Sequence, residues 1–97
     1  MRKGRERHGD DLFQIVCTTN EAGAARLGMA VSTRAIGNAV RRNRLRRLIR
    51  ESFRMHRHEL PAVDVFVTAR APARSAPNAE VFASLLGLWQ KIGQAPR

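Results

Sequence analysis

The sequence predicts an α+β domain in which two helices pack on a small β-sheet. Three short segments alternate apolar residues with polar or small ones, which is typical of half-buried strands. Two longer segments repeat apolar residues at helical spacing. Together they give the order β-β-α-β-α, and 97 residues, 43% of them hydrophobic, suffice for one such domain with a modest core.

The chain begins with a charged segment and continues into two predicted strands. Residues 1–10 are expected to form a flexible basic leader, because they lack apolar periodicity, and residues 11–97 to form the single domain. Strands are predicted at 12–18 and 26–32, joined by a hairpin connection at 20–25 that contains a glycine. One face of the second strand carries only small residues, which suits close packing by another group. These residues are Gly28, Ala30 and Ser32.

A long helix is predicted at about 38–58, followed by a strand and a second helix. Asn38 is a suitable N-cap, and Pro61 lies just beyond the expected end of the helix. The third strand is predicted at 62–69, where valines alternate with other residues, and the last helix at about 77–92. The expected core face of the long helix consists of Leu45, Leu48, Ile49, Ser52, Phe53 and Met55.

The positive charge is concentrated in one segment. The chain has 18 Lys plus Arg against 8 Asp plus Glu, a formal net charge of +10. Residues 34–57 contain nine arginines and one acid, so this window carries +8 and the rest only +2. A polyanionic partner is therefore expected. One cysteine excludes an internal disulfide, and no apolar run approaches the ~20 residues of a membrane span, so we expect a cytoplasmic protein without membrane contact.

Helical spacing places the basic residues in a stripe opposite the core face. The stripe consists of Asn43, Arg46, Arg47, Arg50, Arg54 and Arg57. Like charges at i, i+4 destabilise a helix, and only Glu51 is near enough to offset them, so a bound polyanion would compensate. The alternative is a solvated face that keeps the protein soluble. Solvated faces usually mix Glu and Lys, whereas this one is nearly pure arginine with one asparagine, which favours RNA contact.

The long helix also carries a family resemblance. The chain closely resembles the arginine-rich signature of the bacterial ribonuclease P protein subunit in the segment IGNAVRRNRLRRLIRESFR, residues 36–54. The resemblance continues through HELPAVDVFVTAR, residues 58–70, and the LLGLWQKI of the last helix. It implies a two-layer sandwich, like that of some ribosomal proteins, with a left-handed β-α-β crossover. It also implies an accessory subunit of an endoribonuclease whose catalytic groups lie in an RNA, which removes the 5′ leader of precursor tRNA.

The resemblance assigns roles to particular residues. In the family the arginine helix faces the catalytic RNA, and a cleft between that helix and the sheet takes the single-stranded leader. The expected RNA-facing residues are Arg34, Asn38, Arg41, Arg42, Asn43, Arg44, Arg46, Arg47, Arg50 and Arg54. The candidates for the cleft floor are Phe13, Ile15 and Phe66. Family members generally carry an N-terminal helix that walls the cleft, and here a charged segment of some ten residues stands in its place.

The expected partners are the ribonuclease P catalytic RNA and the precursor tRNA 5′ leader. One protein per RNA and a monomeric free protein are expected. We expect no catalytic group and no metal site in the protein, since His8, His56 and His58 do not form a ligand set, and Mg²⁺ would be held mainly by RNA. The alternatives are another RNA-binding module, such as a ribosomal protein, and a DNA-binding domain. Strands flank the long helix, however, whereas a helix-turn-helix needs a second helix close by.

Overall fold

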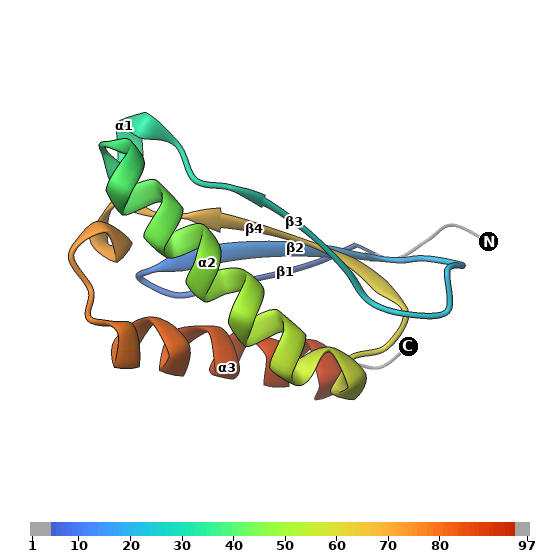
Figure 1. The fold of residues 1–97 in the computed structure, drawn as a ribbon. Coiled ribbons are helices and arrows are strands. Elements are labelled where there is room, and N and C mark those ends of the chain that lie inside the picture. Colours follow the sequence, from blue (N-terminus) through green and yellow to red (C-terminus); the bar gives the residue numbers. More distant parts are fainter. Residues whose placement is uncertain (1–4, 95–97) are drawn as a thin grey trace.

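A computed structural model describes residues 5–94, which form two layers. One layer is a four-stranded sheet in the order β1-β2-β4-β3, and the other contains the helices α2 and α3, which lie on one face of that sheet (Figure 1). In chain order the elements are β1 Arg5–Gly9, β2 Phe13–Thr19, β3 Arg26–Ala30, α1 Thr33–Ile36, α2 Ala39–His56, the 3-10 turn η1 Arg57–Glu59, β4 Val63–Ala69, the 3-10 turn η2 Ala71–Arg74 and α3 Asn78–Gln94. The α+β class and the five predicted elements are confirmed, with ends shifted by at most two residues.

The pairing of the strands differs from the predicted hairpin. β2 is antiparallel to β1 and β4, whereas β3 is parallel to β4. The hairpin between the first two predicted strands is therefore wrong, because β4 lies between them and pairs with both. A central position suits β4, whose four residues on the inner face are all buried. The parallel pairing of β3 with β4 requires a crossover, and α1 and α2 supply it.

The flexible leader predicted at residues 1–10 is wrong over residues 5–9, which form the edge strand β1. Residues 1–4 of that leader lie outside the described residues. The turn after β1 is stabilised by the Asp10 carboxylate, which accepts hydrogen bonds from the backbone N–H groups of Leu12 and Phe13, both at 2.9 Å. An edge strand needs no continuous apolar face, so charged residues can form it without the apolar pattern that predicts strands.

The core lies between the inner face of the sheet and the two long helices. The α2 side chains in it are Leu45, Leu48, Ile49, Ser52 and Phe53, as predicted. Met55, also predicted for the core, is instead 55% exposed. It lies at the edge of the apolar arc, about 80° around the helix from Leu45, where it lines an open hollow shared with Phe82 and Leu86 of α3. Asn38 caps α2 as predicted, because its Oδ1 accepts a hydrogen bond from the N–H of Arg41 at 3.0 Å.

One polar contact joins the two long helices inside this core. The indole Nε1 of Trp89 donates to the Oγ of Ser52 at 2.8 Å, and both residues are buried. The ring of Trp89 also meets Phe53 edge-on, with centroids 5.7 Å apart. Because a buried indole N–H needs an acceptor, this bond fixes how α3 is rotated against α2. None of the helices in the described part of the chain is long and apolar enough to cross a membrane.

Replacing Ser52 with Ala should lower the free energy of unfolding by about 1–3 kcal/mol, because the buried Trp89 N–H loses its acceptor. Urea unfolding followed by the fluorescence of Trp89, the single tryptophan of the chain, measures this loss. Ser75→Ala, at an exposed position, is the matched control and should change the free energy by no more than about 0.5 kcal/mol. Equal stability of the two variants would contradict the role assigned to Ser52.

Candidate nucleic-acid interface

The polar stripe of α2 lies on the helix face opposite the core, as its spacing predicts. Five of its residues are exposed, and Arg46 is half-buried. The exposed ones are Asn43, Arg47, Arg50, Arg54 and Arg57. No α2 arginine forms an ion pair with a carboxylate within the described part of the chain. The stripe is therefore a row of cationic groups without ion pairs in the described structure, and Glu51 is the single acid on the same helix.

Arginines near the two ends of α2 donate hydrogen bonds to the backbone of other elements. Arg42 Nε donates to the carbonyl of Gly37 at 3.2 Å, and Arg57 Nε, just after α2, donates to the carbonyl of Ala25 at 2.9 Å. Arg44 donates to Oδ1 of Asn78, from Nε at 3.0 Å and from Nη2 at 2.8 Å, and also to the carbonyl of Ala76. These bonds tie α2 to the start of β3 and to the start of α3. Of the predicted RNA-facing residues, Arg42 and Arg44 thus have a structural role as well.

The two predicted asparagines have different environments. Asn43 is exposed and accepts a hydrogen bond at its Oδ1 from Nη1 of Arg46 at 3.1 Å, so its Oδ1 is engaged while its amide N–H₂ group can still donate. Asn38 uses its Oδ1 to cap α2. Arg34 lies on the short helix α1, next to the start of α2, and Arg41 lies in the first turn of α2; both are exposed.

Two of the three predicted cleft residues are contradicted by the structure. Phe13 and Ile15 are both 0% exposed, because odd-numbered β2 residues face the helices. Core side chains of α2 and α3 cover both residues, so neither can line an open cleft for a leader. Phe66 alone is accessible, with 46% of its surface exposed on the opposite, open face of the sheet. The sequence alone did not decide which residues of each strand face the helices, and the structure shows that the odd-numbered residues of β2 do.

On the open face of the sheet, Phe66 belongs to a row of neighbouring residues that crosses all four strands. The register places Arg7 opposite Val16, Val16 opposite Phe66 and Phe66 opposite Gly28. A Cβ atom on Gly28 would lie only 3.0 Å from Cδ1 of Phe66, so the absent side chain lets this ring pack against β3. This agrees with the close packing predicted for the small-residue face. A hollow of about 430 Å³ beside the ring is lined by residues that include Val16, Thr18 and Gly28.

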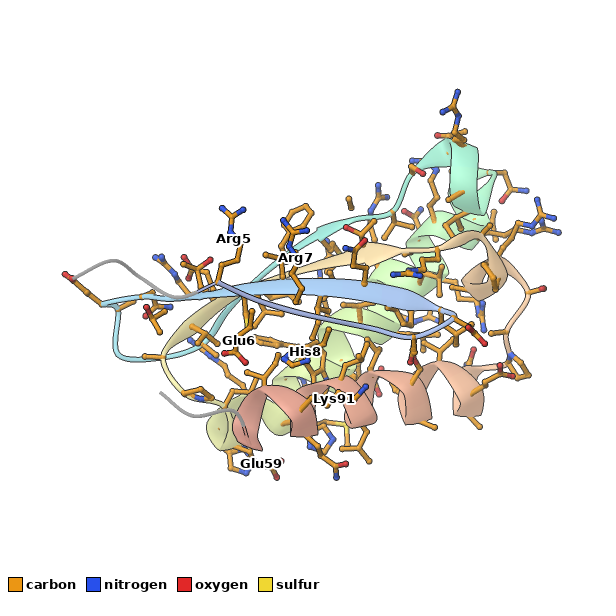
Figure 2. All side chains as sticks on the ribbon, turned by 180° about the vertical axis from the view of Figure 1, so that it is seen from behind. Arg5, Glu6, Arg7, His8, Glu59 and Lys91 are labelled. Carbon is orange, nitrogen blue, oxygen red and sulfur yellow. The ribbon has the colours of Figure 1, made fainter. Side chains whose placement is uncertain are left out.

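Charges on the open face lie mainly on β1 and at one end of β3. Arg5 and Arg7 project from β1 away from α3, whereas Glu6 and His8 point toward α3, on which Lys91 lies (Figure 2). Sequence reasoning missed Arg5 and Arg7 because the segment was interpreted as a leader. The alternation of Arg5 and Arg7 with Glu6 and His8 was the sequence pattern that could have indicated a strand here.

One carboxylate on this face is neutralised by an arginine. Asp64 binds Arg26 through both oxygens, at 2.7 Å to Nε and 3.0 Å to Nη2, and accepts a third hydrogen bond from Nδ2 of Asn20 at 2.9 Å. The hydrogen bond to Asp64, and then its negative charge, raise the pKa of Arg26. Because this pair is neutral overall, the positive charge of the open face comes from other residues, among them Arg5 and Arg7 of β1.

The described residues contain no group of three or more His, Cys, Asp and Glu side chains that could hold a metal ion. The fold and its surfaces define a small basic α+β protein with an arginine stripe on the helix layer and an open, partly aromatic sheet face on the other layer. Both surfaces are of a type that contacts polyanions.

Comparison of the sequence with known proteins identifies the family to which this small basic protein is related. A model of the ribonuclease P family matches residues 1–93. The ribonuclease P protein component of Chromohalobacter salexigens is 41% identical over 85 residues, which are 88% of this chain and 66% of that protein. The corresponding protein of Vibrio parahaemolyticus is 41% identical over 91 residues, 94% of this chain and 77% of that protein.

Solved structures agree with the sequence matches. The RNase P protein of Staphylococcus aureus has a TM-score of 0.82 at 34% identity, over 93% of this chain and 82% of that chain. The RNase P protein of Thermotoga maritima has a TM-score of 0.82 at 28% identity, over 91% of this chain and 84% of that one. The chain therefore belongs to the ribonuclease P protein family, and it spans about two thirds to three quarters of the length of the two relatives named above.

Replacing Ile15 with Ala should lower the free energy of unfolding by about 2–5 kcal/mol, because it leaves a cavity in the core. Phe66→Ala should cost clearly less, about 1 kcal/mol, because nearly half of that side chain is already in water. Chemical unfolding of the two variants compares these costs directly. The reverse order, with Phe66→Ala the more destabilising, would mean that the two faces of the sheet are misassigned.

Proposed function

We propose that this chain is the protein subunit of ribonuclease P, which binds the catalytic RNA and the 5′ leader of precursor tRNA and assists removal of the leader. The observation that carries the proposal is the arginine stripe of α2, which forms no ion pair in the described structure and lies in the segment resembling the family signature. The family match supports the same function.

The stripe has the dimensions and chemistry to contact an RNA backbone. From Asn43 to Arg57 it extends roughly 21 Å along the helix axis, long enough for several phosphates. The planar guanidinium group can hold two phosphate oxygens at once. Each phosphate neutralised releases condensed counterions, so binding to the catalytic RNA should weaken steeply with salt. The N–H₂ group of Asn43 can donate to a sugar or a base edge between the arginines.

The open face of the sheet is the candidate surface for the leader. Phe66 presents an aromatic ring on which a leader base can stack whatever its identity. Arg7 lies in the same cross-strand row and Arg5 in the next, where they can contact the leader phosphates. The stripe and the open face belong to opposite layers of the sandwich. One small protein can therefore contact the catalytic RNA through its helices and the substrate through its sheet.

The chemistry of cleavage is assigned to the RNA in this proposal. The protein supplies binding and orientation, through the arginines of the stripe and the exposed ring of Phe66. Mg²⁺ required by the holoenzyme would be held mainly by RNA phosphates. We place the protein in the bacterial cytoplasm, with one copy per RNA and a monomeric free state.

Reconstitution with the ribonuclease P RNA of the same organism tests the proposal. The protein should increase the rate of precursor tRNA cleavage at low Mg²⁺ concentration. Arg50→Ala should weaken RNA binding and flatten the plot of log K against log[salt] by about one unit, because one phosphate contact is lost. Lys91→Ala removes the same charge from the exposed side of α3 and should leave binding unchanged.

Two results would overturn the proposal. One is the absence of any stimulation of cleavage by the wild-type protein. The other is stronger binding to ribosomal RNA fragments than to the ribonuclease P RNA, which would favour a ribosomal role.

A further inference from the structure

A second arginine cluster lies where α1, η2 and the first turn of α2 meet. At its centre is Gly37, whose φ of 104° favours glycine. A Cβ atom placed on Gly37 would be 3.8 Å from Cδ of Arg74 and 3.9 Å from both Cδ and Nη1 of Arg41. The Nε of Arg42 donates to the carbonyl of the same glycine. Arginine side chains from two elements thus converge on one residue.

The position of Arg74 is fixed by its neighbours in the chain. Ala73 is 0% exposed and Ala76 is 6% exposed, so the backbone on both sides of Arg74 is anchored in the core. Arg44 of α2 holds the same segment through its hydrogen bonds to the carbonyl of Ala76 and to the side chain of Asn78. Arg74 is therefore held beside Arg41 by the fold and not by an attraction between the two side chains.

This arrangement brings two like charges together without compensation. Both Arg41 and Arg74 are exposed, and neither forms an ion pair with a carboxylate of the described residues. Guanidinium groups on two side chains that both pack around Gly37 repel each other, and an anion bound between them would relieve that repulsion. An oxyanion between them would receive charge-assisted hydrogen bonds from both planar groups.

We infer that Arg41 and Arg74 together bind one backbone phosphate of the RNA partner, at a contact separate from the α2 stripe. The inference rests on the proposed function, because it takes the catalytic RNA as the source of the phosphate. It adds Arg74 of η2, which lies outside the arginine-rich segment 36–54, to the residues that contact RNA. It also gives Arg44 a second role as a positioning residue, since its hydrogen bonds hold η2 against α2.

Equilibrium binding to the ribonuclease P RNA tests the inference. Dissociation constants are measured between about 50 and 200 mM KCl for the wild type, Arg41→Ala, Arg74→Ala and the double variant, with Lys91→Ala as the control of equal charge. Circular dichroism shows that each variant is folded. Arg74→Ala should weaken binding about fivefold to tenfold, and Lys91→Ala should not weaken it. The double variant should flatten the salt slope by about one unit in total, because one phosphate contact is lost.

The outcomes separate this inference from the proposed function. If the wild type binds the RNA but Arg74→Ala binds as tightly as Lys91→Ala, the inference is overturned and the proposed function stands. If the double variant flattens the slope by about two units, the two arginines contact separate phosphates and the shared site is wrong. If the wild type does not bind the RNA, both the proposed function and the inference fall.

Discussion

A row of like charges along one helix is the constraint on which the rest of this structure depends. The arginines of α2 repel one another, and the first turn of the helix carries no acid that would favour its dipole. The helix forms because its other face is buried and because Asn38 caps its first turn. Arg42 and Arg44 add hydrogen bonds to other elements. The middle of the helix is left with four exposed or half-buried arginines, which form no ion pair among the described residues and share the helix with one acid, Glu51.

The topology fixes where this row of charges lies. Because β3 pairs in parallel with β4, the chain must cross over the sheet, and α2 is the long element of that crossover. Its apolar face covers the inner side of the sheet, so its arginines point away from the core. The same arrangement leaves the other side of the sheet uncovered, with Phe66 exposed on it. Packing thus produces two separate surfaces, one cationic and one partly aromatic.

Local patterns predicted the helices and the stripe well, because helical periodicity and capping act over a few residues. The N-cap at Asn38 followed from its residue type, and five of the six predicted core positions of α2 followed from spacing, with Met55 as the exception. The small-residue face of β3 also indicated a close contact, which the ring of Phe66 makes at Gly28.

Features that depend on pairing between distant segments could not be predicted in this way. An alternating strand fits either face equally well, so Phe13 and Ile15 were assigned to the wrong side. The place of β4 between β2 and β3 depends on contacts across more than thirty residues, from Gly28 to Phe66 for example. Edge strand β1 has no apolar signal at all. The contact of Arg74 with Gly37 likewise exists only once η2 is packed.

The central claim is that the arginines of the α2 stripe repel one another in the free protein, and the salt dependence of stability tests it most directly. The free energy of unfolding should rise between about 0.01 and 0.1 M NaCl, as the screening length falls from about 30 to about 10 Å. The rise should be smaller in a variant with Arg47→Gln and Arg54→Gln. A variant with Arg7→Gln and Lys91→Gln, which removes the same charge from other elements, should keep the rise of the wild type. A free energy of unfolding that falls with salt, or an equal response of the two double variants, would contradict the account.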